Sequence, residues 1–523
     1  MALPRLIHAL LSPLAYPENP ASVELCQTHI SYILLTPRYA YKIKKPVDLG
    51  FLDFTTLEKR RHFCAEEVRL NKRLAPDAYL GVLPISKKGN RAVIGGAGSP
   101  VEYAVWMKRF RQEDILEDRL VKGLLTEDVI KKVALKIASF HANAATGAGI
   151  SQFGMPWHIR ENANENFFQT KAFISKTISR SAFNAIKDYT DGFLRDNERL
   201  FLKRVKRGFI RDCHGDLHLE HIVVNKGVEV FDAIEFNERF RFSDVISDIA
   251  FLSMDMDFHN RHDLSRVLDD RYVAGSGDNQ GRRLFDFYKC YRAYVRGKVD
   301  GIKSMELEVN EADRRDARIS AMRHFRLSFH YATGGFSPEL VIISGLAGTG
   351  KSTLAESISR ATGLVRLSSD SVRKGLSGIK GLRHAYADYK AGMYTDEFTK
   401  RTYDGLIKKG ISCLKAGRSV ILDATFSKAG FLKKAINLAG HAGLKKNAVH
   451  VIQCVADDRA ARKNLLKRQR EDAAGRKTLS DATWEIYIRQ KKDFEPINAP
   501  HLALNASSGV TENTDKAIKR IFS

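Results

Sequence analysis

The sequence lacks the features of a secreted, membrane-spanning or zinc-binding protein. Its six cysteines are scattered and include no Cys-x-x-Cys pair, which argues against a disulfide framework and a zinc site. No apolar run reaches the roughly 18 residues that a membrane-spanning helix needs, and residues 1–8 carry no signal-peptide segment. We therefore expect a cytoplasmic protein that does not enter a membrane.

Acidic residues are scarce relative to basic ones. The chain of 523 residues has 85 Lys and Arg against 61 Asp and Glu, a formal net charge of +24. Such a surplus attracts anions, so nucleotides, an acidic partner or a polynucleotide would all suit it. At about 150 residues per domain, the length predicts roughly two to four folding units.

A glycine-rich segment follows a short apolar run near residue 340. Residues 340–343 are Leu-Val-Ile-Ile, and residues 345–352 read GLAGTGKS. This is a Walker A motif, whose backbone N–H groups surround phosphate oxygens at the start of a helix. We expect Lys351 to neutralise the β- and γ-phosphates and the Ser352 hydroxyl to bind Mg²⁺. The predicted ATP-binding residues are Gly345, Leu346, Ala347, Gly348, Thr349, Gly350, Lys351, Ser352 and Thr353.

Short apolar runs alternate with amphipathic helical segments over residues 340–523. This alternation predicts an α/β domain, a parallel sheet with helices on both faces, preceded by a turn-rich linker at residues 331–339. The predicted strands are residues 340–344, 364–368, 419–423, 448–455 and 501–505.

Charged residues stand at the ends of two of these strands. Asp370 is placed to accept a proton from an acceptor hydroxyl as the catalytic base, or else to cap the next helix. Arg373, one turn later, is predicted to bind an anionic part of the substrate. Asp423 ends the third strand and is predicted to orient Mg²⁺ or its water, although a structural role in fixing the loop is the alternative.

The spacing over residues 340–500 resembles small P-loop kinases of the polynucleotide, gluconate and zeta-toxin type. The step from Asp370 to Arg373, the strand at residues 421–425 and the turn at residues 480–482 carry the resemblance. It implies ATP and Mg²⁺ as cofactors and a hydroxyl of a small molecule or nucleotide as the phosphate acceptor.

A basic helical segment at residues 459–468 follows the fourth predicted strand. A lid built from it would close arginines over the transferring phosphate, with Arg468 as a catalytic residue; a solvated helix face is the alternative. The resembling kinases carry paired lid arginines four residues apart. The first of that pair falls on Asn464 here, and Arg462 is the candidate to replace it.

Residues 1–330 follow another pattern, a small sheet lobe over about 20–110 and a mostly helical lobe over 111–330. This order is typical of a kinase-like fold. No glycine-rich loop is recognisable between residues 20 and 40. The strand-like segments are residues 32–35, 40–44, 81–86 and 101–110, and one helix is predicted over residues 56–75.

Two sequence motifs in this region contain carboxylates in or next to a loop between strands. Residues 213–224 read CHGDLHLEHIVV and residues 230–236 read VFDAIEF. Asp216 can accept a proton from a hydroxyl, and Asp232 can bridge Mg²⁺ to nucleotide phosphates. The motifs resemble those of aminoglycoside and choline phosphotransferases, which implies a bilobal, protein-kinase-like α+β domain. By the same analogy, Asp244 and Asp248 would brace the loop.

Three more residues complete the predicted N-terminal site. Lys42 and Lys44 share one strand face, and either can pair with Glu67 to set the α- and β-phosphates of ATP. Lys42 is favoured, Lys44 is the close competitor, and a surface charge is the alternative. His221 is assigned to the metal site, where the resembling family has a magnesium-binding asparagine, and imidazole prefers softer metals than Mg²⁺.

The order of the two regions resembles bacterial bifunctional aminoglycoside phosphotransferase/ATP-binding proteins over nearly the full chain, most clearly at residues 40–75. The resemblance implies an ATP-dependent kinase. Two alternatives stay open: an ATP-binding regulator with a degenerate N-terminal pseudokinase, suggested by His221 and Asn464, and a nucleic-acid 5′-hydroxyl kinase, suggested by the net charge of +24.

Overall fold

The structure is a computed structural model that describes residues 3–88, 91–377, 395–473 and 483–522. The chain packs into two compact units. Unit 1 comprises Met1–Ala163, Gly192–Asp255 and Arg266–Lys289, and unit 2 comprises Asn164–Asp191, Met256–Ser265 and Cys290–Ser523. The predicted linker lies within unit 2, and a domain division at that point stays a prediction. Across the described ranges, no helix is both long enough and apolar enough to span a membrane.

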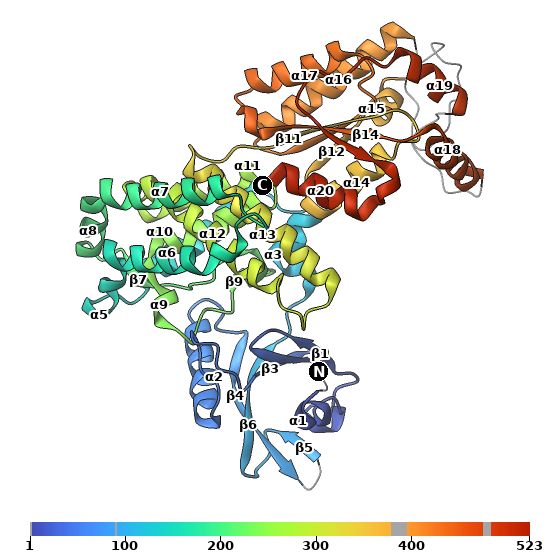
Figure 1. The fold of residues 1–523 in the computed structure, drawn as a ribbon. Coiled ribbons are helices and arrows are strands. Elements are labelled where there is room, and N and C mark those ends of the chain that lie inside the picture. The colour runs from blue at the N-terminus through green and yellow to red at the C-terminus, as the bar shows by residue number, and fades with distance from the viewer. Residues whose placement is uncertain (1–2, 89–90, 378–394, 474–482, 523) are drawn as a thin grey trace. The chain divides into compact units, whose positions relative to one another are not determined.

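Unit 1 contains, within the described residues, a six-stranded antiparallel sheet in the order β1-β2-β3-β6-β4-β5 (Figure 1). The four predicted strands correspond to β2, β3, β4 and β6. The sequence did not predict β1 and β5, because each has only four residues and β1 is largely exposed. The strands are β1 (Glu24–Gln27), β2 (Ser31–Leu35), β3 (Tyr39–Lys44), β4 (Tyr79–Lys88), β5 (Arg91–Ile94) and β6 (Pro100–Lys108).

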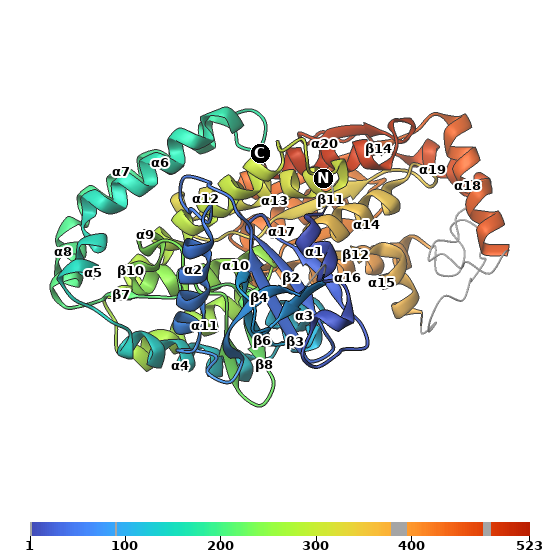
Figure 2. The ribbon, with the colours of Figure 1, turned by 90° about the horizontal axis from the view of Figure 1, so that it is seen from below.

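A helix packs on each face of this sheet, and α2 lies beside β4 in both views (Figures 1 and 2). Helix α1 (Arg5–Ala9) covers the face that carries Tyr41, and α2 (Leu57–Asn71) covers the face that carries Ala40. Because side chains alternate along a strand, Lys42 and Lys44 of β3 share the face of Ala40. Both lysines therefore point towards α2.

The chain after β6 is mostly helical, as the sequence predicts. Two short antiparallel pairs interrupt the helices, β7 with β10 and β8 with β9. The loop between β7 (Ile210–Asp212) and β8 (Ile222–Val224) carries Asp216 and His221, and β9 (Val228–Val230) leads into Asp232. The remaining elements up to residue 303 are α3 (Leu116–Val121), α4 (Glu127–Asn143), α5 (Ala148–Ser151), α6 (Pro156–Thr170), α7 (Arg180–Asp196), α8 (Glu198–Lys206), α9 (Glu238–Arg241), β10 (Phe242–Asp244), α10 (Val245–Phe258), α11 (His262–Ser276) and α12 (Phe285–Lys303).

Unit 2 contains a parallel sheet in the order β12-β13-β11-β14-β15. This confirms the predicted parallel sheet, and each predicted strand agrees with an observed one to within one residue. The strand β11 lies at the centre, so the glycine-rich loop leaves the middle of the sheet. The strands are β11 (Leu340–Ser344), β12 (Val365–Ser368), β13 (Val420–Asp423), β14 (Val449–Val455) and β15 (Leu502–Asn505).

Helices cover both faces of this sheet (Figure 1). One face packs against α14, α20 and Ile319 of α13, and the other packs against α16 and α17. Residues that precede the predicted linker therefore contribute to the core of unit 2. The helices are α13 (Glu311–Ala332), α14 (Lys351–Thr362), α15 (Ser369–Leu376), α16 (Asp396–Lys415), α17 (Ala429–His441), α18 (Asp458–Ala473), α19 (Trp484–Asp493) and α20 (Val510–Phe522).

Asn260 shows why a segment from the middle of the chain belongs to unit 2. Its backbone is left-handed, with φ 60°. Its side chain donates a hydrogen bond to the carbonyl of Ser419 over 3.1 Å and accepts one from the N–H of Ser419 over 2.5 Å. These bonds hold the residue that precedes β13.

Candidate functional site

The loop after β11 has a backbone that its glycines permit. Gly348 and Gly350 have φ values of 77° and 80°, which a residue with a side chain seldom adopts. A Cβ atom at Gly348 would lie 2.7 Å from the carbonyl oxygen of Ala461, and one at Gly345 would lie 2.6 Å from that of Cys454. Close packing of the loop therefore requires glycine at 345 and 348, in addition to the access for phosphate that the sequence indicates.

Helix α14 begins at Lys351, directly after this loop, with Gly350 as its N-cap. The side chain of Lys351 lines a cavity, and none of the described residues forms a hydrogen bond or an ion pair with its ammonium group. Thr353 is exposed on the first turn of the helix. A helix amino terminus with an adjacent lysine is an anion-binding arrangement.

Asp423 connects the end of β13 to the glycine-rich loop. Its carboxylate is buried and accepts a hydrogen bond from the Ser352 hydroxyl over 3.3 Å. Arg366, on the adjacent strand β12, places Nη2 2.7 Å from Asp423 Oδ2. A hydroxyl and a carboxylate suit Mg²⁺, whereas the contact with Arg366 favours a structural role, so both predicted roles of Asp423 stay open. Sequence reasoning missed Arg366, although a charge inside an apolar strand was a signal.

Asp370 lies in the first turn of α15, directly after β12. The N-cap of this helix is Ser368, whose hydroxyl accepts a hydrogen bond from the N–H of Ser371 over 3.4 Å. The alternative that Asp370 caps the helix is therefore wrong. Asp370 lines the same cavity as Lys351, and so does Arg373, whose Nη1 lies 3.5 Å from Thr399 Oγ1.

The cavity that these residues share has a volume of about 620 Å³. One part of its wall is aromatic: Phe431 stacks on Tyr403 with ring centroids 4.2 Å apart and planes inclined by 5°. The rest of the wall includes charged side chains of both signs. It includes Lys400, Lys428, Lys434, Asp396, Asp404 and Asp493. The cavity has room for a second molecule beside the glycine-rich loop.

Helix α18 carries the residues that the sequence assigned to a lid. Arg468 lies on this helix, and it is not among the described residues that line the cavity, so its lid role stays a prediction. Asn464 donates a hydrogen bond to the carbonyl of Gly348 over 2.9 Å and thereby holds the glycine-rich loop. The guanidinium of Arg462 lies 5.7 Å from the ring centroid of Trp484. The turn at residues 480–482 lies outside the described residues.

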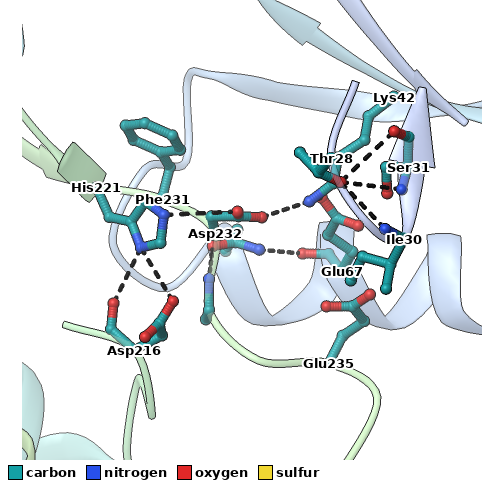
Figure 3. Close-up of polar contacts among 12 residues, drawn as sticks. Thr28, Ile30, Ser31, Lys42, Glu67, Asp216, His221, Phe231, Asp232 and Glu235 are labelled. Carbon is teal, nitrogen blue, oxygen red and sulfur yellow. Dashed lines mark hydrogen bonds and ion pairs between the residues drawn. The ribbon is translucent and has the colours of Figure 1, made fainter. Parts of the chain in front are cut away.

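In unit 1, Glu67 contacts both predicted lysines, and Figure 3 shows it beside Lys42. Lys42 Nζ is 2.9 Å from Glu67 Oε1, and Lys44 Nζ is 2.7 Å from Glu67 Oε2. Lys42 also pairs with Asp232, and Lys44 pairs with Glu235, a residue to which the sequence assigned no role. The side chains of the lysines are 11% and 0% exposed, so the surface-charge alternative is wrong. Both lysines reach Glu67, and the choice between them stays open.

The pKa values in this cluster follow from opposing effects. Burial lowers the pKa of Lys42, but Asp232 and Glu67 outweigh burial and hold it well above its ordinary value. Burial raises the pKa of Asp232, but Lys42 and His221 outweigh it and hold the pKa below its usual range. Burial dominates at Glu235 and raises its pKa despite Lys44. The lysines are therefore charged, and carboxylates of the protein itself neutralise them.

The loop after β7 places His221 between the two predicted carboxylates (Figure 3). His221 Nδ1 is 3.6 Å from Asp216 Oδ2, and His221 Nε2 is 3.7 Å from Asp232 Oδ2. His218 Nε2 is 3.4 Å from Asp216 Oδ2. Burial and the neighbouring His218 lower the pKa of His221, so its neutral form is favoured. Sequence reasoning assigned no role to His218.

Asp248 braces this loop, as the analogy predicts. Its carboxylate accepts hydrogen bonds from the backbone N–H groups of His214 and Gly215 over 3.0 and 2.8 Å. Asp244 acts elsewhere, because it pairs with the buried Arg204 over 2.8 Å. The backbone at the start of this loop is therefore held by Asp248, which lies on α10.

The turn between β1 and β2 is closed by a hydroxyl instead of by glycines (Figure 3). Thr28 Oγ1 accepts hydrogen bonds from the N–H groups of Ile30 and Ser31 over 3.3 and 3.0 Å. This turn lies within the range where the sequence shows no glycine-rich loop, and its lack of glycine explains why no motif marked it.

Several known proteins are similar to this chain. Residues 340–497 match the family model described as an AAA domain. A gluconokinase from Sinorhizobium meliloti is 14% identical, with a TM-score of 0.26, over 36% of this chain and 93% of that protein. A choline/ethanolamine kinase family protein from Mesorhizobium loti is 11% identical, with a TM-score of 0.38, over 62% of this chain and 98% of that protein.

Two mycobacterial relatives match a larger part of the chain. Rv2004c of Mycobacterium tuberculosis, an uncharacterized protein, is 32% identical over 405 residues, which are 77% of this chain and 78% of the relative. Mb2027c of Mycobacterium bovis, also an uncharacterized protein, has the same identity and coverage. By this identity over most of both lengths, the chain belongs to the protein family of Rv2004c and Mb2027c.

Proposed function

We propose that this protein is an ATP- and Mg²⁺-dependent phosphotransferase whose C-terminal region transfers the γ-phosphate of ATP to a hydroxyl group of a small molecule or a nucleotide. One observation carries the proposal: Lys351 of the Walker A loop and the carboxylate of Asp370 line the same cavity. The match of residues 340–497 to an AAA domain supports nucleotide binding by this region.

The residues of the chain divide the work between the two substrates. The N–H groups of the glycine-rich loop bind the phosphates, and Lys351 neutralises their charge. The acceptor oxygen bonds to the γ-phosphorus while the bond to the bridging oxygen breaks and ADP leaves, and Asp370 takes the proton of the acceptor hydroxyl. Arg373 orients an anionic part of the acceptor. Ser352 and Asp423 would hold Mg²⁺, which supplies further charge neutralisation when bound.

The test is a screen for an acceptor with ATP labelled in the γ-phosphate and a fractionated metabolite extract. Wild-type protein is compared with the variants Lys351→Ala and Asp216→Asn, and Lys516→Ala on α20 serves as a control for the loss of a lysine. We expect Lys351→Ala alone to abolish labelling. If only Asp216→Asn abolishes it, unit 1 performs the reaction and the proposal is wrong.

The nature of the acceptor needs its own arm of the screen. Oligonucleotides with a 5′-hydroxyl group are added as acceptors at several salt concentrations. Their labelling, together with binding that weakens steeply with salt, would replace the small molecule by a nucleic acid.

A regulatory, ATP-binding protein is the second candidate function, and the ion pairs of unit 1 favour it. Lys42 and Asp232, which a phosphotransferase of this type directs at nucleotide phosphates and a metal, pair with each other. ATP binding without transfer to any acceptor, with Mn²⁺ as well as with Mg²⁺, would support this candidate over the first.

A further inference from the structure

Three side chains of the loop after β7 direct metal-ligating atoms at one point. The carboxylate of Asp216 and the imidazoles of His218 and His221 each offer one such atom, and the three atoms lie within 4.8 Å of one another. Asp216 Oδ2 is 3.4 Å from His218 Nε2 and 3.6 Å from His221 Nδ1. In a tetrahedral site with metal–ligand bonds of about 2.1 Å, ligand atoms lie about 3.4 Å apart. The two distances from Asp216 Oδ2 are therefore close to the spacing of ligands around a bound ion.

Both ring nitrogens of His221 face oxygen atoms, and a cation can take the place of the hydrogen at one of these nitrogens. The Nδ1 atom faces two oxygen atoms of Asp216, the backbone carbonyl at 3.0 Å and Oδ2 at 3.6 Å, and Nε2 faces Asp232 Oδ2 at 3.7 Å. A neutral imidazole carries only one hydrogen, so it cannot donate in both directions. Nδ1 is within hydrogen-bonding distance of the Asp216 carbonyl, so a cation that binds Nδ1 replaces the hydrogen of that contact, and the ring hydrogen then lies on Nε2.

The surroundings hold these ligands in place. With the ring hydrogen on Nε2, that hydrogen faces Asp232 Oδ2, which lies 3.7 Å from Nε2, on the side on which carboxylates orient metal-binding imidazoles. The N–H of Leu219, between the two histidines, donates a hydrogen bond to Asp255 over 2.9 Å. The rings of His218 and His221 have centroids only 4.0 Å apart. The loop is therefore held by hydrogen bonds before Asp216 and between the two histidines.

The donor set does not fit Mg²⁺. This ion requires near-octahedral oxygen ligands, whereas two of the three donors here are imidazole nitrogens. Asp232, the carboxylate predicted to bind Mg²⁺, is also neutralised by Lys42. Two imidazoles and one carboxylate are typical ligands of Zn²⁺ and related divalent transition metals.

We propose that Asp216, His218 and His221 form a binding site for a divalent transition-metal ion of the Zn²⁺ and Co²⁺ class. Such an ion occupies the oxygen with which Asp216 would accept a proton, so a loaded site removes Asp216 from the role of base. The site is a property of unit 1 and does not depend on the proposed reaction of the C-terminal region.

The test uses the full chain, treated with a chelator and then titrated with Co²⁺ without nucleotide. We expect one equivalent of Co²⁺ to give the visible absorption bands of a low-coordinate site with nitrogen and oxygen ligands, and Zn²⁺ but not Mg²⁺ to remove them. His218→Gln and His221→Asn should each weaken binding by about 100-fold or more, because changes outside a ligand set already cost about 10–100-fold. His501→Gln, at an exposed histidine, should leave binding unchanged.

A second measurement keeps the proposal open to refutation if a variant does not fold. Zinc K-edge X-ray absorption of the wild-type protein loaded with one equivalent of Zn²⁺ should show the scattering pattern of two imidazole ligands. An oxygen-only ligand set, an absence of binding, or binding that survives in correctly folded His218→Gln and His221→Asn proteins would overturn the proposal. In that case the hydrogen bond of His221 Nδ1 with the Asp216 carbonyl accounts for the position of the ring.

Discussion

The two candidate sites differ in where their buried charges lie. In unit 2, none of the described residues pairs with Lys351, although Asp423 close to it pairs with Arg366. Glu339, which precedes β11, is buried against Arg326, His330 and His450, whereas the glycine-rich loop with Lys351 follows the strand. In unit 1, by contrast, Lys42 and Lys44 are paired with the carboxylates of the predicted site itself.

The comparison shows which lysine is available to bind a nucleotide phosphate. A lysine that forms no ion pair within the protein is available to neutralise a phosphate. Among the described residues, none pairs with Lys351. Pairing with Glu67 is the arrangement expected to position a lysine for phosphates, but Lys42 also pairs with Asp232, the carboxylate predicted to bridge the metal, and must give up that contact to bind a nucleotide. This contrast supports the proposal that unit 2, and not unit 1, transfers phosphate.

The largest expected effect concerns the two candidate bases. Asp370→Asn should lower kcat by about 10²–10⁴-fold with an acceptor found in the screen, because general-base catalysis contributes about that much. ATP affinity, measured by calorimetry, should stay unchanged. Asp216→Asn is the matched variant in unit 1 and should leave kcat unaltered. Equal losses in both variants would remove the distinction between the two sites.

Loss of Glu67 should have the next largest effect, and on stability instead of activity. Glu67→Gln leaves Lys42 and Lys44 without their shared carboxylate, and breaking a buried ion pair costs about 3–5 kcal/mol. Hydrogen exchange of β3 and α2, read by mass spectrometry, measures the loss within unit 1.

The control for this variant is an exposed glutamate. Glu356, which pairs with Arg360, is 56% exposed. Glu356→Gln should change the free energy of opening of its own helix, measured by hydrogen exchange, by less than about 0.5 kcal/mol. If Glu67→Gln is equally mild, the cluster of unit 1 is not held by its ion pairs.

Lys351→Met should weaken ATP binding by about 10- to 100-fold, because a hydrogen bond to a charged group contributes about 1.5–3 kcal/mol. The thermal stability of the protein without nucleotide should not fall, since no described residue pairs with this lysine. Calorimetry gives the affinity, and a melting curve gives the stability. Lys42→Met, the variant in unit 1, should show the opposite pattern: a lower melting temperature and little change in ATP affinity.

Acid should destabilise unit 2 because it protonates the buried carboxylate of Glu339, which precedes β11. Burial raises the pKa of Glu339, but Arg326, His330 and His450 outweigh burial and hold it well below its ordinary value of 4.5. Its contribution to stability is therefore present above pH 4.5 and lost as the pH falls further. Burial lowers the pKa of His330 below 6.5, so the unfolded state takes up that proton first and stability already falls below pH 6.5.

Urea unfolding at a series of pH values checks this dependence, with hydrogen exchange of β11 and α13 as the local measurement. Glu339→Gln should remove the fall in the free energy of unfolding below pH 4.5. It should keep the fall below pH 6.5 that is attributed to His330. An unchanged slope in this variant would place the acid sensitivity elsewhere in the chain.

Much of the C-terminal site was predictable because its signals are local. The apolar strands, the glycine-rich loop and the position of Asp370 after β12 depend on neighbours in the sequence. The capping alternative for Asp370 failed because Ser368, two residues earlier, takes the N-cap position. The partner of Asp423 was not predictable, since Arg366 meets it only through the pairing of β12 with β13.

Sequence patterns were enough to predict the glycine-rich loop, the parallel sheet of the C-terminal region, and the residue types of the N-terminal cluster. The partners of these residues became known from the fold alone. Glu67 pairs with two lysines, Asn464 bonds to the glycine-rich loop, and two histidines lie beside Asp216. The reason is physical. A strand pattern or a glycine-rich turn is set by residues close in the chain, whereas a buried charge is stabilised by whichever partner the fold brings within a few ångströms.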